Sequence, residues 1–143
     1  MSKRKKYEPA AFESGKSLLP PKVAETSANI FRSMMFSEAW HDLTNRQRNL
    51  YLTAKAMYYG TRKPEKDYPD IKAFQGDDKL YLNLNEVVKY GTYTKNMRGE
   101  LYTDIKALEE HGFLKTISNG KARKIKSVYQ YSDGWKEWKP CEP

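Results

Sequence analysis

The feature that most constrains the fold is the change from helical to strand periodicity at Gly112. Before this glycine, apolar residues recur at near-fourfold spacing, which is typical of a helix with one buried face. This apolar stripe consists of Met97, Leu101, Ile105 and Leu108. After the glycine, the alternating runs 113–117 and 127–131 flank an Asn119-Gly120 turn signal and predict a β-hairpin with a long, basic loop. A helix therefore leads directly into a hairpin, which favours an α+β fold.

Shorter elements are predicted upstream of this helix. Leucines at alternate positions in 80–84 indicate a short strand, and Asn85 is placed to cap a brief helix that ends at Gly91. Thr94 is the expected N-cap of the longer helix, although Gly99 within it is also compatible with a later start. The predicted order from residue 80 is strand, short helix, turn, longer helix and hairpin.

A further helix is predicted over residues 45–59. Thr44 and Gln47 form a capping-box pattern at its start. Gly60 stands where a C-cap glycine would end it. This helix is expected to pack beside the elements of the 80–132 segment in one core.

Short helical turns are expected at both ends of the domain. Ser37 is placed to cap a turn that runs through Trp40, and the apolar stretch 30–35 before it has a strand as one interpretation. Trp135 and Trp138 lie three residues apart and predict a terminal turn that folds back on the core. We expect these tryptophans to fill the core or an interface rather than to stack on bases.

The length of 143 residues allows one core but not two independent ones. The first 27 residues lack sustained periodicity, which indicates a flexible arm, and proline, glycine and charges in 61–79 indicate a loop. The expected organisation is a basic arm (1–27), one domain (28–139) and a tail (140–143). Within the domain we expect a helical part (28–60), the loop (61–79) and a core segment (80–132).

The formal net charge of +8 is concentrated in two places. Residues 1–22 hold six basic and two acidic side chains, and residues 111–132 hold five basic ones and no acidic one. Clustered Lys and Arg gain affinity for phosphate backbones by releasing condensed counterions. The segregation therefore indicates a surface that faces a polyanion, and the alternative is a solvated charge run that maintains solubility.

Patterns typical of enzymes and metal sites do not occur in the sequence. His41, His111 and the single Cys141 do not stand at metal-ligand spacing. The glycines do not show the spacing of a phosphate-binding or dinucleotide-binding loop, and Asp77-Asp78 beside Gly76 is typical of a turn. We therefore expect no catalytic site, no cofactor and no metal.

The segment Leu108-Glu109-Glu110-His111-Gly112-Phe113-Leu114 resembles the junction of recognition helix and wing in winged-helix regulators and replication initiators. That family commonly shows a Leu-x-x-x-Gly-[Phe/Leu]-[Ile/Leu] signature there, and the resemblance covers about residues 80–132. Upstream, Ser37-Glu38-Ala39-Trp40 followed by Leu43-Thr44 is similar to the opening of initiator-like proteins of bacterial plasmids, phages and integrative elements. The resemblance implies a winged helix-turn-helix with an N-terminal helical extension, although the loop 60–79 is unusually long for it.

The resemblance implies that the longer helix enters the major groove of double-stranded DNA and that the basic hairpin reaches phosphates. Arg98 is placed to contact guanine and Asn96 to contact adenine, whereas Glu100 would repel phosphate and narrow the DNA-facing strip. The candidate DNA-binding residues of the helix are Lys95, Asn96, Arg98, Thr103 and Lys106. Those of the hairpin are Lys115, Lys121, Arg123, Lys124 and Lys126, and those of the arm are Lys3, Arg4, Lys5 and Lys6. An edge hairpin protected from aggregation by lysines is the alternative interpretation of the basic wing.

The sequence thus favours a double-stranded DNA-binding protein of a bacterial mobile element, active in replication initiation, DNA transfer or transcriptional regulation. The alternative is a winged-helix protein interaction module without DNA binding. DNA is the expected partner, and a second copy of the chain or other replication or transfer proteins are further candidates. The single cysteine and the lack of a long apolar run indicate a cytoplasmic protein without a membrane segment.

Overall fold

The computed structural model describes residues 28–57, 79–118 and 127–140. These ranges have the mixed α+β composition expected from the sequence, and none of their helices is long and apolar enough to cross a membrane. The α-helices are α1 (Arg32–Met35), α2 (Glu38–Asp42), α3 (Asn45–Ala56), α4 (Leu84–Val87) and α5 (Arg98–Glu110). The 3₁₀-helices are η2 (Val88–Tyr90) and η4 (Gly134–Lys136), and the strands are β1 (Lys79–Tyr81), β2 (Leu114–Ser118) and β3 (Val128–Tyr131). The expected arm 1–27 and nearly all of the expected loop 61–79 lie outside the described residues.

Side-chain caps begin α2 and α3, as the sequence predicts. The Ser37 hydroxyl accepts a hydrogen bond from the Trp40 backbone N–H at 3.2 Å. The Thr44 hydroxyl accepts from the Gln47 N–H at 3.2 Å, and the Gln47 side-chain oxygen accepts from the Thr44 N–H at 2.9 Å. The capping box of α3 is thereby confirmed. α3 ends at Ala56 with Met57 as its C-cap, so the helix predicted to run through residue 59 is too long.

Residues 32–35 are helical, so a strand over 30–35 is wrong. The backbone N–H groups of Met35 and Phe36 donate to carbonyls one helical turn earlier, each at 3.2 Å. These local bonds satisfy the backbone without a neighbouring strand. Met34 alone among the residues of α1 is buried, so one helical turn suffices to bring it into the core.

The sheet has the strand order β1-β3-β2, and both pairs are antiparallel. Tyr129 lies opposite Leu80 on one side and opposite Thr116 on the other. β2 and β3 form the predicted hairpin, with a register irregularity between Thr116 and Ser118. The tip of this hairpin, with its Asn119-Gly120 signal, lies outside the described residues. Because β1 pairs with β3, the segment before α4 and the hairpin after α5 belong to one sheet.

β1 ends at Tyr81, so the strand predicted through Leu84 is too long. Asn83, not Asn85, is the N-cap of α4, and its side-chain oxygen accepts from the Glu86 N–H at 3.2 Å. Leu84 is therefore the first residue of a helix. Leu80 therefore lies in β1, Leu82 in the connection and Leu84 in α4, because the Asn83 cap begins the helix there.

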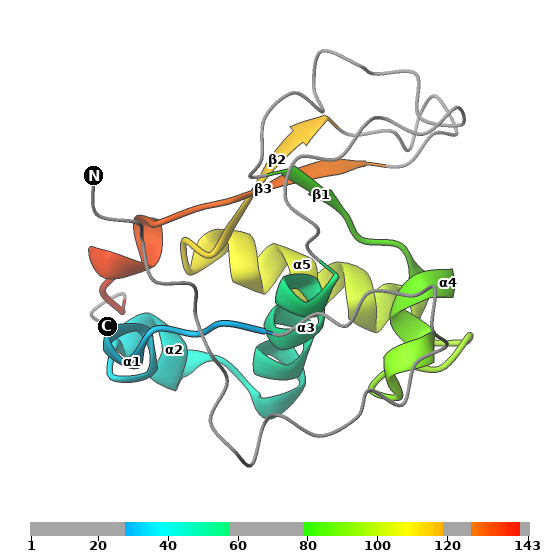
Figure 1. The fold of residues 1–143 in the computed structure, drawn as a ribbon, viewed down its shortest axis with the longest axis horizontal. Helices are drawn as coiled ribbons and strands as arrows, with labels where there is room; N and C mark the ends of the chain where they lie inside the picture. The colour runs from blue at the N-terminus through cyan, green and yellow to red at the C-terminus, as the bar shows by residue number, and fades with distance from the viewer. Residues whose placement is uncertain (1–27, 58–78, 119–126, 141–143) are drawn as a thin grey trace, which may run out of the picture.

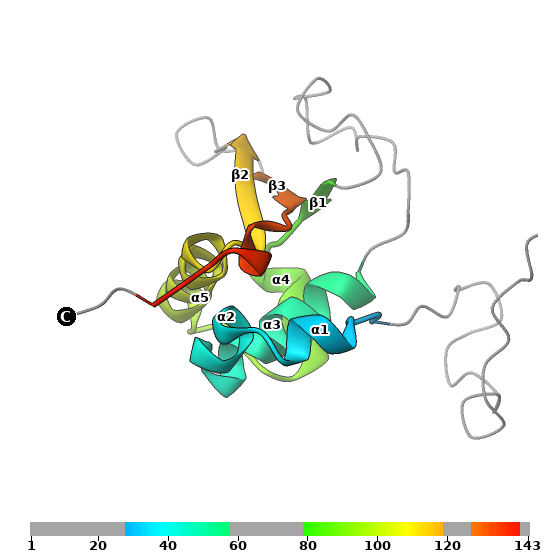
Figure 2. The same cartoon turned by 90° about the vertical axis from the view of Figure 1, so that its left-hand side faces the viewer.

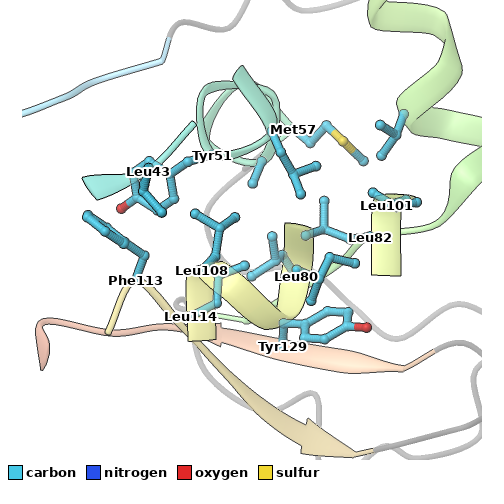
Figure 3. Packing of buried hydrophobic residues seen from close by; sticks show 14 of the residues in the cluster. Leu43, Tyr51, Met57, Leu80, Leu82, Leu101, Leu108, Phe113, Leu114 and Tyr129 are labelled. Atoms are coloured by element: carbon cyan, nitrogen blue, oxygen red, sulfur yellow. The ribbon is translucent and has the colours of Figure 1, made fainter. Parts of the chain in front are cut away.

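The core lies between the helices and the sheet. Figures 1 and 2 show the sheet on one side and α1 to α3 on the other, with α5 beside both. Figure 3 shows side chains from α3, α5 and the strands that point toward one another, among them Tyr51, Leu101, Leu108, Leu80 and Tyr129. The predicted stripe of α5 is buried at its last three positions and half-buried at Met97. Burial of each large apolar side chain contributes about 1.5–3 kcal/mol of stability.

The segment after β3 folds back on the core through a close contact of two glycines. Gly112 has a φ of 83°, and a Cβ there would lie 2.4 Å from backbone atoms of Gly134 and Trp135. The Gly112 carbonyl accepts from the Trp135 N–H at 3.1 Å, and the Trp135 ring stacks on Phe113. Trp135 is buried and Trp138 packs against the core, so the predicted terminal turn is confirmed.

Candidate functional site

α5 has one buried face and one exposed face. Its buried positions are Leu101, Asp104, Ile105 and Leu108. On the other side, Arg98, Tyr102 and Lys106 are exposed and recur every four residues, so they form one row along the helix, called here the outer row. Thr103 is exposed beside this row, and its hydroxyl donates to the Gly99 carbonyl at 3.0 Å. The outer row combines two cations with one aromatic side chain.

Acidic side chains flank the outer row. Glu100 is exposed in the first turn of α5, and Glu110 is exposed at its last residue. Glu109 faces the sheet instead, where it accepts a hydrogen bond from the Thr116 hydroxyl. The positive strip along α5 is therefore narrow, as the position of Glu100 in the sequence indicates.

α5 begins at Arg98, so the expected N-cap at Thr94 is wrong. Met97 occupies the N-cap position, and the Thr94 carbonyl closes a turn by accepting from the Met97 N–H at 3.0 Å. Lys95 and Asn96 are therefore exposed in a turn before the helix and do not lie on its outer face. The later start is the alternative that the sequence had left open.

A buried carboxylate holds α5 against α3 and against the segment that precedes α5. Asp104 accepts from the Tyr93 hydroxyl at 2.5 Å and from the Arg46 Nε at 2.6 Å. The Arg46 Nη2 at 3.3 Å and the Gln47 Nε2 at 3.4 Å donate to its second oxygen. Tyr93 is 2% exposed and precedes α5, so its bond to Asp104 fixes the preceding segment against the helix. We call these four residues the Asp104 network.

The network shifts the pKa values of two of its members. The hydrogen bond to Asp104 raises the pKa of Arg46. Burial raises the pKa of Tyr93, and the hydrogen bond to Asp104 raises it further. Both side chains are therefore held in the forms that donate to the carboxylate, a charged guanidinium and a neutral phenol.

Sequence reasoning missed the Asp104 network, although a signal for it exists. Asp104 falls between Leu101, Ile105 and Leu108 on the same face of the helix. An acidic residue at a buried helical position needs donors, because burial of an unpaired carboxylate is costly. The donors come from distant parts of the chain and could not be identified by spacing.

α4 and η2 form the short helical segment that precedes α5. Val87 is fully buried, and Gly91 ends η2 with a φ of 89°, as the predicted C-cap requires. Nothing lies within 4 Å of a Cβ built at Gly91, so this glycine serves the turn conformation and not a close contact. The turn directs the chain toward the start of α5.

A cavity of 640 Å³ opens beside the N-terminal half of α5. Its walls come from the connection between β1 and α4, from α5 and from β3, and include Leu82, Leu101 and Tyr129. Arg98 and Tyr102 of the outer row also line it. Because its lining is mainly aliphatic and aromatic, the surface beside Arg98 favours carbon-rich groups over phosphates.

Lys115 is the hairpin candidate that the structure describes. It is exposed on β2 opposite Gln130, whereas the neighbouring Thr116 faces α5 through Glu109. Since successive side chains of a strand point to opposite faces, Lys115 points away from α5 and does not share a surface with the outer row. The candidates Lys121, Arg123, Lys124, Lys126, Lys3, Arg4, Lys5 and Lys6 lie outside the described residues.

His111 joins the ends of α2 and α5. Its Nδ1 lies 2.6 Å from the Ala107 carbonyl oxygen and its Nε2 lies 2.7 Å from the Asp42 carboxylate. The ring stacks on Trp138 with 4.6 Å between centroids, and His41 is exposed. Within the described ranges, no group of three or more His, Cys, Asp or Glu side chains is arranged to hold a metal ion.

Comparison with known proteins adds no relative to these observations: no protein-family model matches the chain, and neither curated proteins nor solved structures give a significant match.

Proposed function

We propose that the chain forms a winged helix-turn-helix and that it binds double-stranded DNA. In this proposal, α4, η2 and the Gly91 turn lead into α5, which enters the major groove, since that groove accepts one α-helix. The β2–β3 hairpin is the wing. The observation that carries the proposal is the sheet order β1-β3-β2, because the pairing of β1 with β3 ties the hairpin and the helical segment before α5 into one unit.

The exposed side chains of α5 support a division of roles. Arg98 lies at the N-terminal end of α5, where a recognition helix reads base edges, and it is exposed. Lys106 and Thr103 lie further along the same face and are assigned to contacts with the duplex. Lys95 and Asn96 precede the helix, so we assign them to the DNA backbone rather than to bases. The basic residues of the wing tip and the arm supply further phosphate contacts.

The resemblance of Leu108–Leu114 to winged-helix regulators and initiators supports a role on a bacterial mobile element. Replication initiation, DNA transfer and transcriptional regulation each require a protein that binds one duplex site. We place this protein in that group, acting in the cytoplasm on element DNA. Selection of bound sequences from random duplexes identifies the site, and its position in the element distinguishes the three roles.

The decisive experiment separates base reading from phosphate contact. Arg98→Ala is expected to cost about 1–3 kcal/mol of binding free energy on the selected sequence and little on random duplex. Changing Lys121, Arg123 and Lys124 together to Ala is expected to weaken both sequences alike and to flatten the salt slope by about 3. Lys89→Ala is the matched control, because it removes an exposed cation from η2 and leaves α5 unchanged. If Arg98→Ala and Lys89→Ala lose the same binding free energy on the selected sequence, the net charge alone determines the affinity and Arg98 does not read a base.

A protein interaction module is the second candidate, favoured by the mixed character of the exposed surface. Tyr102 is 53% exposed and Ile117 is 38% exposed, and Glu100 and Glu110 flank the outer row. Exposed aromatic and aliphatic side chains are typical of protein interfaces. If the triple wing variant keeps the affinity and salt slope of the parent for DNA but loses a protein partner in a pull-down, this candidate replaces DNA binding.

A further inference from the structure

A second concave surface lies away from the outer row. It is a cavity of 490 Å³ between α1, α3, the sheet and the segment 132–136, and none of its described lining residues belongs to α5. Three lysines line it, Lys55 from α3, Lys115 from β2 and Lys136 from η4, and we call it the lysine pocket. Figure 1 shows α1 and η4 (red), which border it, to the left of α3 and α4 to the right.

The pocket carries an excess of positive charge. Asp133 is the acidic side chain among its described lining residues, against the three lysines. Ion pairs within the described part of the chain do not involve these lysines. Lys55 Nζ lies 5.1 Å from the centre of the Tyr131 ring, and Lys136 Nζ lies 5.7 Å from that of Trp135. A cation above an aromatic face keeps its N–H donors available for an anion.

The same pocket presents an aromatic surface. Phe31 lines it and is 71% exposed, whereas Tyr51 and Trp135 form a buried aromatic floor. Asn29 and Ser132 add neutral polar groups to the rim. An exposed ring beside cations is the arrangement that proteins use to stack a base next to a bound phosphate.

We propose that the lysine pocket binds a nucleoside phosphate, either free or as part of a single-stranded nucleic acid. The phosphate lies against Lys55, Lys115 and Lys136, and the base stacks on Phe31. A volume of 490 Å³ falls in the range of small-molecule sites, about 300–1,000 Å³. This binding goes beyond the proposed reading of duplex DNA, because it uses a different surface and none of the outer row.

The test measures binding to the full chain by titration calorimetry with AMP, inorganic pyrophosphate and a single-stranded oligothymidylate. Lys115→Ala/Lys136→Ala is the pocket variant, since both side chains are exposed and their truncation leaves the core intact. Lys89→Ala/Lys139→Ala is the matched control, which removes two exposed cations elsewhere. The pocket variant is expected to lose about tenfold or more in AMP affinity, because it lacks the charged hydrogen bonds from Lys115 and Lys136 to the phosphate. The control is expected to keep the AMP affinity of the parent.

Phe31→Ala separates the base from the phosphate. It is expected to weaken AMP binding by about tenfold, the loss of one stacked ring, and to leave pyrophosphate binding unchanged. Oligothymidylate that binds more tightly than AMP, and loses this advantage in the pocket variant, identifies a single strand as the source. Equal affinities identify the free nucleotide.

Two outcomes overturn the proposal. One is a folded parent that binds neither AMP nor oligothymidylate at millimolar concentration and low salt. The other is an equal loss of AMP affinity in the pocket and control variants, with thermal melts that show both to be folded. Duplex binding measured on the same proteins keeps this result distinct from the proposed function, because both double variants leave Arg98, Tyr102 and Lys106 of the outer row in place.

Discussion

Replacement of Asp104 by Ala is expected to loosen α5 from α3 and to lower the free energy of unfolding by about 3 kcal/mol. The carboxylate is fully buried and is the common acceptor for Tyr93, Arg46 and Gln47. Its removal breaks the contact that fixes both the start of α5 and its position on α3. The same variant is expected to weaken duplex binding, because α5 then presents the outer row in more than one orientation.

The magnitude follows from what each partner loses. The Tyr93 hydroxyl is left buried without an acceptor, which costs about 1–3 kcal/mol. The Arg46 side chain is 40% exposed, so water replaces the carboxylate and the lost ion pair contributes at most about 1 kcal/mol. The missing carboxyl group also leaves a small void that costs about 1 kcal/mol. With the Tyr93 and Arg46 losses taken at the middle of their ranges, the three losses add up to about 3 kcal/mol.

Variants of the residues that bind Asp104 are expected to lose different amounts of stability, depending on whether the carboxylate stays paired. Tyr93→Phe is expected to cost about 1–2 kcal/mol, because Asp104 remains paired with Arg46. Arg46→Ala is expected to cost about 2–3 kcal/mol despite the exposure of Arg46, because it strands a buried charge. In the Asp104→Ala background, Arg46→Ala should add less than about 0.5 kcal/mol, since the arginine has no carboxylate left to pair with.

Urea unfolding followed by tryptophan fluorescence at neutral pH measures these differences. An Asp104→Ala variant within about 0.5 kcal/mol of the parent would refute the anchoring role of the carboxylate. Strict additivity in the Arg46 and Asp104 double variant would refute the pairing even if each single variant were destabilised.

Three further perturbations test the fold. Gly112→Ala is expected to cost about 3 kcal/mol or more, against about 1 kcal/mol for the equally left-handed but open Gly91→Ala; equal costs in urea melts would rule out the close contact. Leu101→Ala or Ile105→Ala should cost about 2–5 kcal/mol, and thermal melts that match the parent would place that face in solvent. Burial raises the pKa of Tyr51 from 10.0 to about 12. The neutral phenol therefore contributes fully to the free energy of unfolding below pH 10, and this contribution is lost as the pH rises to 12. Between pH 10 and pH 12 the free energy of unfolding of the parent should fall by about 2–3 kcal/mol more than that of Tyr51→Phe. Parallel plots of unfolding free energy against pH would contradict the assignment.

The local signals of the sequence identified several elements correctly. The Ser37 cap, the Thr44 and Gln47 capping box and the two left-handed glycines, Gly91 and Gly112, occur where they were predicted. Each depends on contacts between residues within four positions of one another, or on a backbone conformation that glycine adopts easily. The apolar stripe of α5 was predictable for the same reason, since a helix repeats its faces at a fixed interval.

Local patterns were wrong where a distant contact or a competing cap decided the conformation. Thr94 has the chemistry of an N-cap, but Tyr93 is bound to Asp104 and the helix begins at Arg98. Asn85 has the same chemistry, but Asn83 lies nearer the strand and caps α4 first. A capping preference of about 1 kcal/mol is too small to resist such contacts.

The sequence by itself determined the α+β class, the caps and the helix that leads into a hairpin, because these depend on periodicity and on neighbours along the chain. Only the tertiary structure decided that β1 pairs with β3, that Asp104 joins α3 to α5, and that Lys115 meets Lys55 and Lys136 in one pocket. These contacts join residues that are far apart in the sequence, and no spacing rule relates them. They form because folding buries the apolar faces of α3, α5 and the sheet together, and the polar side chains carried on those elements then meet wherever that packing places them.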